Sequence, residues 1–398
     1  MTSKVGALMD KQYNEGSQLL KFGEVAKLIS ERKNPVPGDE KYYIGLEHLD
    51  SGSLQVKRWG SDVVLKGQKL AIKKGDILFA KRNAYLKRVA LAPFDGIFSA
   101  HGMVIRPTGD KILPEFLPHF MQSDAFMNRA IAISEGSLSP TIKWKTLESQ
   151  EFEFPPIESQ KRALRLLEKI NQCIECYEGA SLSASELCES IIGNELSKLG
   201  KECTTVGDLI DSGDIIEIQD GNHGNDHPKA SEYVSSGIPF VMASDLSLGK
   251  VDVAGCKRLA KDRADKLRIG FSYPGDILLS HKGTVGLVAV TPAVSDYIML
   301  TPQVTYYRVN EEGRLLAKFL EVYFRSRSFQ MILKSLSAQS TRAYIGITAQ
   351  KKLPVPLLSF SKQAEIINIW NLFQNETMLL SEARSKSTQM ATSIINGA

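Results

Sequence analysis

The tetrapeptide Gly-Asp-Ile-Leu occurs twice in this chain, at residues 75–78 and again at residues 275–278. A match of this length arises by chance roughly once in a chain of average composition, so the flanking segments decide whether it marks a repeat. A duplicated unit that covers half of a chain limits the possible folds more than any single motif does.

The segments around the two copies correspond in the same order along the chain. The matched pairs are residues 25–29 with 206–210, 43–49 with 240–246, 104–106 with 306–308, 115–117 with 318–320, 120–123 with 323–326, and 152–155 with 353–356. Because these landmarks keep their order, we predict two modules of similar structure. Identity between the copies is low, so a shared fold with different surfaces is expected. Two unrelated globular modules with similar patterning are the alternative.

Composition leaves the functional class open. The chain has 398 residues, 43% hydrophobic and 24% charged, which is ordinary for a globular protein of two or three domains. No apolar run is long enough to span a membrane, and the first residues lack the apolar core of a secretion signal. Five cysteines fit a reducing compartment, so we expect a cytoplasmic protein. The net charge of +4 is small, so any case for nucleic-acid binding must be local.

Short β-branched runs separated by Gly, Pro and Asp predict strands in both modules. The predicted strands are residues 63–65, 77–79, 89–91 and 103–105 in the first module, and 240–241, 277–279, 285–290 and 304–309 in the second. A helix is expected near residues 115–132, with Pro118 in its first turn or at a break. The corresponding helix of the second module is expected over residues 314–336.

Each module runs into a long segment with a heptad-like apolar seam. The seam residues are Ala163, Leu167, Ile170, Ile174, Tyr177, Ser181, Ala184, Cys188 and Ile191 in the first segment, and Ile366, Ile369, Phe373, Glu376, Leu380, Ala383, Ser387, Met390 and Ile394 in the second. Gly179 and Gly193 are the points at which the first helix could be interrupted. Since a solitary helix of this length cannot bury its stripe, we expect the two helices to pair antiparallel. The alternative is that each folds onto its own domain.

The predicted fold is α+β, with a pseudo-two-fold internal repeat. It has two similar domains, at residues 1–157 and 201–357, and two long, antiparallel, coiled-coil-like spacer helices, at residues 158–200 and 358–398.

Recognisable catalytic motifs are missing from the sequence. Residues 34–37, Asn-Pro-Val-Pro, are the nearest match to the Asn-Pro-Pro-Tyr clamp of DNA amino-methyltransferases, and they lack its aromatic residue. Neither the dinucleotide-binding nor the P-loop glycine pattern occurs. Cys173 and Cys176 have half of a zinc spacing, but buried small side chains are the favoured interpretation. His223 and His227, on either side of Asp226, are interpreted as a polar turn rather than a metal site. We therefore expect no catalytic residues, no bound metal and no cofactor of the chain's own.

A basic loop follows the first Gly-Asp-Ile-Leu block and offers the strongest chemical signal. Lys and Arg neutralise phosphates, Arg reads guanine, and Asn reads adenine in the major groove. The candidate DNA-binding residues of the first module are Lys81, Arg82, Asn83, Tyr85, Lys87, Arg88, Ser139, Thr141, Lys143 and Lys145, and those of the second are His281, Lys282, Thr284, Gln339, Thr341, Arg342 and Tyr344. An isolated loop of this kind is often only solvated. Polar loops at the same point of both modules favour two different readers of DNA.

With these motifs the chain resembles the DNA-specificity subunit of Type I restriction–modification systems. The resemblance rests on the doubled Gly-Asp-Ile-Leu, the module entry at residues 237–241 with Ser244-Asp245-Leu246, and the module exits at residues 154–160 and 355–363. It covers nearly all of the chain. In the first copy the module entry, residues 41–45, lacks the proline found in the second.

The resemblance implies a non-catalytic subunit of a multisubunit site-specific deoxyribonuclease and methyltransferase. Each recognition domain would read half of a bipartite, asymmetric site in double-stranded DNA, and the helices would dock two DNA methyltransferase subunits. ATP-dependent restriction subunits would complete the complex, with S-adenosylmethionine, ATP and Mg²⁺ bound by the partners. The alternatives are a DNA methyltransferase or nuclease with an unrecognised motif, and a coiled-coil scaffold whose modules bind protein.

Overall fold

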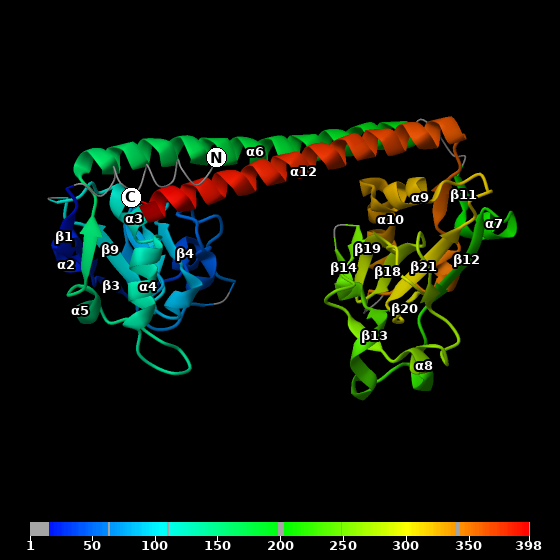
Figure 1. Cartoon of the computed structure of the whole chain (residues 1–398), viewed down its shortest axis with the longest axis horizontal. Coiled ribbons are helices and arrows are strands. Elements are labelled where there is room, and N and C mark those ends of the chain that lie inside the picture. The colour runs from blue at the N-terminus through cyan, green and yellow to red at the C-terminus, as the bar shows by residue number, and fades with distance from the viewer. Residues whose placement is uncertain are drawn as a thin grey trace. The chain divides into compact units, whose positions relative to one another are not determined.

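A computed structural model describes residues 16–62, 64–109, 111–197, 203–247, 249–338 and 343–397. The chain divides into two compact units, the first made of Met1–Glu178 with Ser381–Ala398 and the second of Gly179–Leu380. The long helices α6 (Ile157–Ser197) and α12 (Phe360–Gly397) each contribute to both units (Figure 1). The four domain boundaries expected from the sequence stay a prediction.

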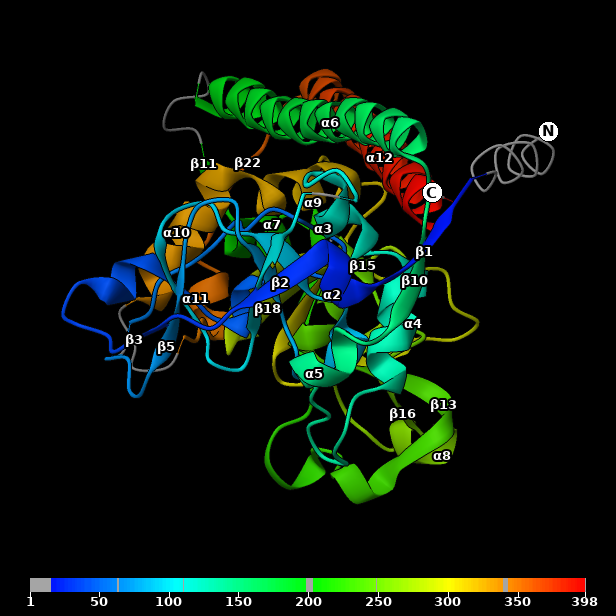
Figure 2. The ribbon, with the colours of Figure 1, turned by 90° about the vertical axis from the view of Figure 1, so that its left-hand side faces the viewer.

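The first module is built from short strands and short helices. In chain order they are β1 (Gln18–Lys21), α2 (Phe22–Val25), β2 (Ala26–Ile29), β3 (Arg32–Lys33), β4 (Tyr43–Ile44), β5 (Lys69–Ile72), β6 (Ile77–Phe79), β7 (Val89–Leu91), β8 (Gly96–Phe98), β9 (Met103–Pro107), α3 (Phe116–Phe120), α4 (Asp124–Ala132), α5 (Trp144–Leu147) and β10 (Glu151–Phe154). The short 3-10 turns η1 (Asp39–Tyr42), η2 (Leu46–His48) and η3 (Ala84–Leu86) lie between strands. Figure 2 gives a second view of these elements.

The second module has a closely similar order of elements. They are β11 (Cys203–Thr205), α7 (Val206–Asp211), β12 (Ile215–Asp220), η4 (Gly224–Asp226), η5 (Ala230–Glu232), β13 (Tyr233–Val241), η6 (Ala243–Asp245), β14 (Leu246–Ser247), β15 (Lys250–Val251), β16 (Lys257–Leu259), α8 (Lys261–Ala264), β17 (Phe271–Ser272), β18 (Ile277–Lys282), β19 (Thr284–Val290), β20 (Ile298–Leu300), β21 (Val304–Val309), α9 (Ala317–Arg325), α10 (Arg327–Ser337), α11 (Ile347–Gln350) and β22 (Pro354–Pro356).

The sheets show that the two modules repeat one topology. A four-stranded antiparallel sheet has the order β2-β9-β6-β7 in the first module and β12-β21-β18-β19 in the second. A second sheet contains a parallel pair, β4 with β8 or β13 with β20, and an antiparallel neighbour, β5 or β17. The strands that enter and leave each module also pair antiparallel, β1 with β10 and β11 with β22. The predicted α+β fold with an internal repeat is therefore confirmed.

The modules differ in where the second sheet gains its fourth strand. In the first module β3 joins the sheet beside β5, whereas in the second β16 joins beside β13, on the opposite edge. The same three-stranded core thus presents different outer edges, as expected for copies that share a fold and differ in surface.

The repeated Gly-Asp-Ile-Leu block has the same structural role in both modules. Gly75 and Gly275 take positive φ values of 89° and 92°, a conformation that favours glycine. The following aspartates, Asp76 and Asp276, are buried and accept two hydrogen bonds from an arginine of the neighbouring strand, Arg106 and Arg308 respectively. Each aspartate also accepts a backbone N–H from the turn, at 2.8 Å in both modules. The motif therefore fixes the turn and the strand that follows it.

A buried glutamine fastens each long helix to the module before it. Gln160 accepts a hydrogen bond from the backbone N–H of Leu113 at 2.8 Å and donates to the carbonyl of Pro155 at 2.8 Å. Gln363 makes the equivalent bonds to Leu316 and Leu358, at 2.8 Å each. Both side chains are almost fully buried.

Each module also receives the end of the long helix that begins after the other module. In the first unit, the Asn396 side chain of α12 accepts from the backbone N–H of Asp124 at 2.8 Å, in the first turn of α4. In the second unit, the Glu189 side chain of α6 accepts from the N–H of Arg327 at 2.9 Å, in the first turn of α10. These acceptors use a donor that a helix start leaves unpaired.

Within each unit α6 and α12 run antiparallel (Figures 1 and 2). In the first unit Ile394 packs in the same cluster as Ala163, while Arg384 pairs with Glu178. In the second unit Cys188 and Ile192 share a core with Ile366 and Trp370. The predicted antiparallel pairing is confirmed, and Gly179 and Gly193 lie inside α6 without interrupting it.

The burial pattern follows the predicted seams with two exceptions. Every predicted seam residue of α6 is buried or half-buried. On α12, Glu376 and Met390 are exposed, and their neighbours Thr377 and Ala391 are half-buried instead. The strict spacing places a charged and a long side chain at these two points, and small residues one position later fit the helix contact better.

Three predicted elements are wrong in detail. Val64 and Leu65 form no strand, and Val64 is 85% exposed, so an apolar pair without a buried face is not sufficient for a strand; Val63 lies outside the described residues. The helix expected over 115–132 is two helices, α3 and α4, with Pro118 in the first turn of α3. The helix expected over 314–336 is likewise α9 and α10. Ser123 and Ser326 start the second helix of each pair by capping Phe126 and Phe329.

Replacing the buried glutamines with leucine should weaken each unit separately. Gln160→Leu and Gln363→Leu each leave a backbone N–H and a carbonyl without a partner, at a cost of about 2–4 kcal/mol. Gln172→Leu and Gln374→Leu, at exposed positions of the same helices, are the matched controls. Chemical denaturation should show a lower free energy of unfolding for the first pair only. Equal effects at all four positions would contradict the role given to these glutamines.

Acid should remove a contribution of Asp214 to stability. Hydrogen bonds from the Arg314 guanidinium lower the pKa of Asp214 to about 2, from 3.8. A depressed carboxyl pKa stabilises the fold above the unfolded value, and this stabilisation is lost as the pH falls from about 4 to about 2. Its size is about 2 kcal/mol. The loss of unfolding free energy between pH 6 and pH 3 should be smaller in Asp214→Asn, and an identical pH profile would contradict the assignment.

Candidate nucleic-acid interface

The basic loop of the first module pairs with the second polar segment predicted from the sequence. Strand β6 leads into residues 80–88, where the N–H of Asn83 donates to the carbonyl of Pro140 at 2.8 Å. The N–H of Ile142 donates to the carbonyl of Lys81 at 3.0 Å, and Arg82 and Thr141 form an isolated β-bridge. Two segments almost 60 residues apart in sequence, as Arg82 and Ser139 illustrate with a separation of 57, thereby form one surface.

The second module makes the same backbone contacts with different residues. The N–H of Gly283 donates to the carbonyl of Ala343 at 3.1 Å, and the N–H of Ile345 donates to the carbonyl of His281 at 2.9 Å. Lys282 and Tyr344 form the β-bridge. Lys282 therefore occupies the place of Arg82, and Tyr344 that of Thr141.

Several cations of the first module are held by polar partners. Arg82 donates to the Ser139 hydroxyl at 2.8 Å, and Lys143 pairs with Glu135 at 2.7 Å. Lys87 pairs with Asp124, also at 2.7 Å. These groups are exposed or half-buried, so such pairs are worth little in water and can exchange for phosphates. Tyr85 is 57% exposed and Lys145 is exposed on α5, while Arg88 is half-buried.

Two residues of the basic loop have left-handed backbones. Asn83 and Lys87 have φ values of 57° and 48° and are the only non-glycine residues with positive φ in the described part of the chain. Asparagine tolerates this conformation, but a lysine there is uncommon. Strain of this kind tends to be kept where a side chain serves a function.

Sequence reasoning missed Arg32, which lies close to the basic loop. Burial first, and then the nearby Arg32 guanidinium, lower the pKa of Lys81. Arg32 and Lys33 form edge strand β3 and are exposed. The signal was present as a basic dipeptide after the first sheet strand, but only the sheet shows that it adjoins Lys81.

The candidates of the second module are unequally accessible. Lys282 and Thr284 are exposed, and the Lys282 ammonium lies 6.0 Å from the centre of the Tyr344 ring. His281 is 1% exposed, so it supports this surface from beneath. Burial lowers the pKa of His281, which favours a neutral ring. Gln339, Thr341 and Arg342 lie outside the described residues.

Of the two metal-like motifs in the sequence, the cysteine pair lies in a different environment from the one expected, and the histidine pair flanks a turn. Cys173 and Cys176 are exposed, so their interpretation as buried side chains is wrong. They lie on the outer face of α6, beside the half-buried seam residue Ile174. His223 and His227 lie on either side of the turn η4, and His223 is hydrogen-bonded to Asp220 at 2.8 Å.

Within the described residues, no three His, Cys, Asp or Glu side chains are grouped to hold a metal ion. No described helix is long and apolar enough to cross a membrane.

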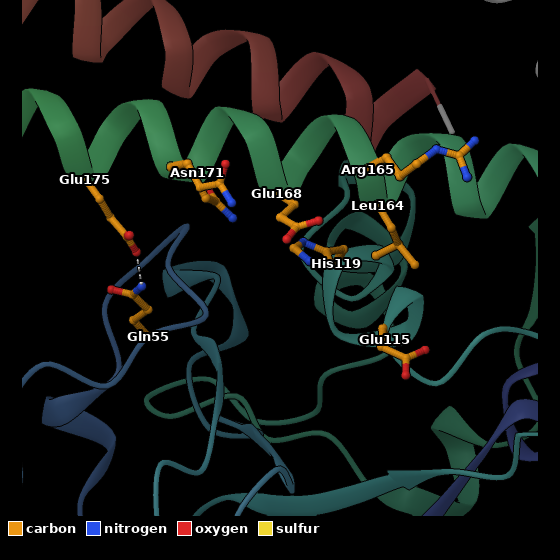
Figure 3. A pocket seen from close by; sticks show the side chains of 9 residues that line it. Gln55, Glu115, His119, Leu164, Arg165, Glu168, Asn171 and Glu175 are labelled. Atoms are coloured by element: carbon orange, nitrogen blue, oxygen red, sulfur yellow. Dashed lines mark hydrogen bonds between the residues drawn. The ribbon is translucent and has the colours of Figure 1, made fainter.

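A pocket in the first unit has mainly acidic residues among the charged residues of its lining, whereas the loop over residues 80–88 is basic (Figure 3). It lies against α3 and α6, has a volume of about 490 Å³, and includes Glu115, Glu168 and Glu175 in its lining with one arginine, Arg165. Burial lowers the pKa of His119 in this pocket to about 4, so the ring is neutral at pH 7. Three carboxylates opposite one guanidinium disfavour a polyanion, and the basic loop remains the candidate surface for DNA.

The comparisons with known proteins point to one family. A family model described as the Type I restriction modification DNA specificity domain matches residues 14–182. The Type I restriction enzyme EcoDI specificity subunit of Escherichia coli is 26% identical over 155 residues, which are 38% of this chain and 34% of that protein. This chain thus matches only about a third of the length of that relative.

One solved structure shows the same fold over almost the whole chain. It is described as the structural basis of complex assembly and conformational transition of the type I R-M system, has a TM-score of 0.61 at 20% identity, and covers 97% of this chain and 99% of its own. The HsdS subunit from Thermoanaerobacter tengcongensis has a TM-score of 0.45 at 20% identity, over 96% of this chain and 95% of that one.

Replacing Lys87 tests whether its left-handed backbone is kept for the side chain. Lys87→Gly relieves the positive φ, so the free energy of unfolding should be equal or higher by up to about 1 kcal/mol. The same change removes the charge, so DNA affinity should fall. Lys87→Asn, which also tolerates this backbone, should behave alike. Unchanged DNA affinity with raised stability would show that the lysine has no role in binding.

Proposed function

We propose that this chain, which belongs to the Type I restriction–modification DNA specificity family, is the DNA-recognition subunit of such a complex. Each module would read one half of a bipartite, asymmetric site in double-stranded DNA. The chain would have no catalytic activity of its own, and it would act in the prokaryotic cytoplasm.

The observation that carries this proposal is the equivalent pairing of two loops in both modules. Arg82 bridges to Thr141 in one, and Lys282 bridges to Tyr344 in the other, within the same backbone geometry. One scaffold with exchanged side chains is what two readers of different sequences need. Positions that contact base edges specify sequence, while the phosphate contacts around them fix the orientation.

The side chains at this surface suit contact with DNA. Lys81, Arg82, Lys87 and Arg88 concentrate positive charge on one loop, and Arg32 adds to it. Asn83 and Tyr85 lie among them and offer an amide and an exposed ring. The acids near the loop, Asp124 and Glu135, are each paired with a lysine, so little unpaired negative charge opposes a phosphate there.

The long helices would dock two DNA methyltransferase subunits, and restriction subunits would join that complex. Exposed apolar side chains on the helices support this part of the proposal: Leu182, Leu187, Leu372, Met378 and Leu379 are each more than half exposed in the second unit. Such residues commonly mark a protein-binding surface. S-adenosylmethionine, ATP and Mg²⁺ would be bound by those partners, since no motif for them occurs in this chain.

Removing two cations of the basic loop should weaken DNA binding through one half-site. For Arg82→Ala with Lys87→Ala, we expect a loss of about 1–3 kcal/mol per base contact, or a salt dependence reduced by about one unit per phosphate contact. Binding of the full-length chain to a cognate duplex, measured by gel shift or fluorescence anisotropy over a salt series, provides the test.

Lys161→Ala is the matched control, because Lys161 is an exposed cation at the start of α6 that pairs with Glu158. An unchanged affinity in the double variant, or an equal loss in the control, would contradict the assignment. The test can be interpreted only if the parent chain itself binds DNA with sequence selectivity.

A further inference from the structure

The second module contains a cavity beside its predicted DNA loop that no sequence motif marked. It has a volume of about 410 Å³ and is lined, among others, by Lys282, His223, His227, Thr301 and Gln303. These residues come from the end of β18, the segment after β12, and the turn after β20. The segment after β12 is the one interpreted above only as a polar turn.

Close packing directs the segment after β12 to this place. A Cβ atom at Gly221 would lie 1.9 Å from the carbonyl oxygen of Leu300, so only glycine fits there. Asn222 is buried, donates to the carbonyl of Ile269, and accepts from the N–H of Arg268 at 3.2 Å. The next residues therefore pass the turn after β20 and reach Lys282.

The cavity holds hydrogen-bonding groups that the protein itself does not use. Thr301 is 3% exposed, and its hydroxyl has no hydrogen-bond partner among the described residues. The Nδ1 atom of His227 is also buried without a partner there. Unpaired buried polar atoms are costly and rare, so two of them on residues that line one cavity point to a ligand that supplies the missing bonds.

The first module shows the same position in a satisfied state. Ser99 and Thr301 are equivalent, because each donates its backbone N–H at 3.0 Å to the parallel strand, to Ile44 and Val241 respectively. The Ser99 hydroxyl accepts a hydrogen bond from the backbone N–H of His101 at 3.4 Å, and the Tyr43 hydroxyl lies near it. The residue equivalent to Tyr43 is Phe240, which has no hydroxyl. The Thr301 hydroxyl has no such partner among the described residues and is available.

The charge of the cavity favours an anion. None of the residues that line it is Asp or Glu. Lys282 forms no ion pair with a described residue, and its ammonium lies 6.0 Å from the centre of the Tyr344 ring. Two carboxylates close to the lining residues are already paired: Asp220 is buried and hydrogen-bonded to His223 at 2.8 Å, and Asp226 pairs with Arg268. An ammonium, a hydroxyl and imidazole nitrogens together match the acceptor oxygens of a phosphate.

We propose that this cavity binds a phosphate group of the DNA backbone and so anchors the second module on its half-site. This rests on the proposed function and adds Thr301 and His227 to the predicted DNA contact Lys282. Thr301 and His227 would hydrogen-bond the phosphate oxygens, with Lys282 as the cation. A contact of this kind positions the module without selecting a base.

The test uses Thr301→Val, which removes the hydroxyl at nearly constant shape. In the full-length chain, we expect about fivefold weaker binding to the cognate duplex, as befits one lost charge-assisted hydrogen bond. The same factor should appear with duplexes that carry base changes in the second half-site. A neutral methylphosphonate at one backbone position should abolish the difference between variant and parent.

Thr305→Val is the matched control, since Thr305 is another fully buried threonine with an unpartnered hydroxyl but does not line the cavity. Both variants should unfold at the parent's temperature or above it, because each removes an unpaired buried group. A Thr301→Val chain that binds as Thr305→Val does would overturn the proposal. So would a loss confined to one base pair and untouched by every methylphosphonate, which would make the cavity a base reader. If the parent shows no sequence preference at all, it is the proposed function that fails.

Discussion

The buried Asp–Arg pair is the interaction on which each module depends. Asp76 with Arg106, and Asp276 with Arg308, join the Gly-Asp turn to the adjacent strand through two hydrogen bonds. Breaking such a pair by removing one partner costs about 3–5 kcal/mol, because the other charge stays buried. The strand after the turn, β6 or β18, leads directly into the predicted DNA loop. The repeated motif therefore places the loop, and the loop is free to vary in sequence from one module to the other.

Hydrogen bonds also join each module to the long helices. Gln160 and Gln363 fasten the start of each helix to the module it leaves, and Asn396 and Glu189 bring its far part to the module it reaches. Within each unit the recognition module is thus bonded to both helices. Under the proposed function, each predicted DNA loop needs a tie to a stiff element. Buried amides at the start of each helix and single acceptors near its end supply that tie, and the acceptors Asn396 and Glu189 use donors that a helix start leaves unpaired.

The parts of the fold that could be predicted from sequence are those with a strong period or a repeated motif. The doubled landmarks predicted the two modules, which the repeated sheet topology confirms, and the apolar seams predicted the helix pair. Ser123 and Ser326 split the predicted single helices, because an N-cap inside a continuous apolar pattern leaves little trace in that pattern. Arg32 and Thr301 were not predicted for another reason: the folded chain alone places Arg32 near Lys81 and puts Phe240 where the first module has Tyr43, and no local pattern encodes either arrangement. The DNA contacts themselves stay a prediction.

The proposed function requires that one chain carry two readers of unlike DNA sequence. The decisive experiment is the selection of bound duplexes from a random DNA pool by the full-length chain together with a methyltransferase partner. Two different short motifs should be enriched at one fixed spacing, separated by positions of any sequence. A single uninterrupted motif, two identical half-sites, or no enrichment over the starting pool would contradict it.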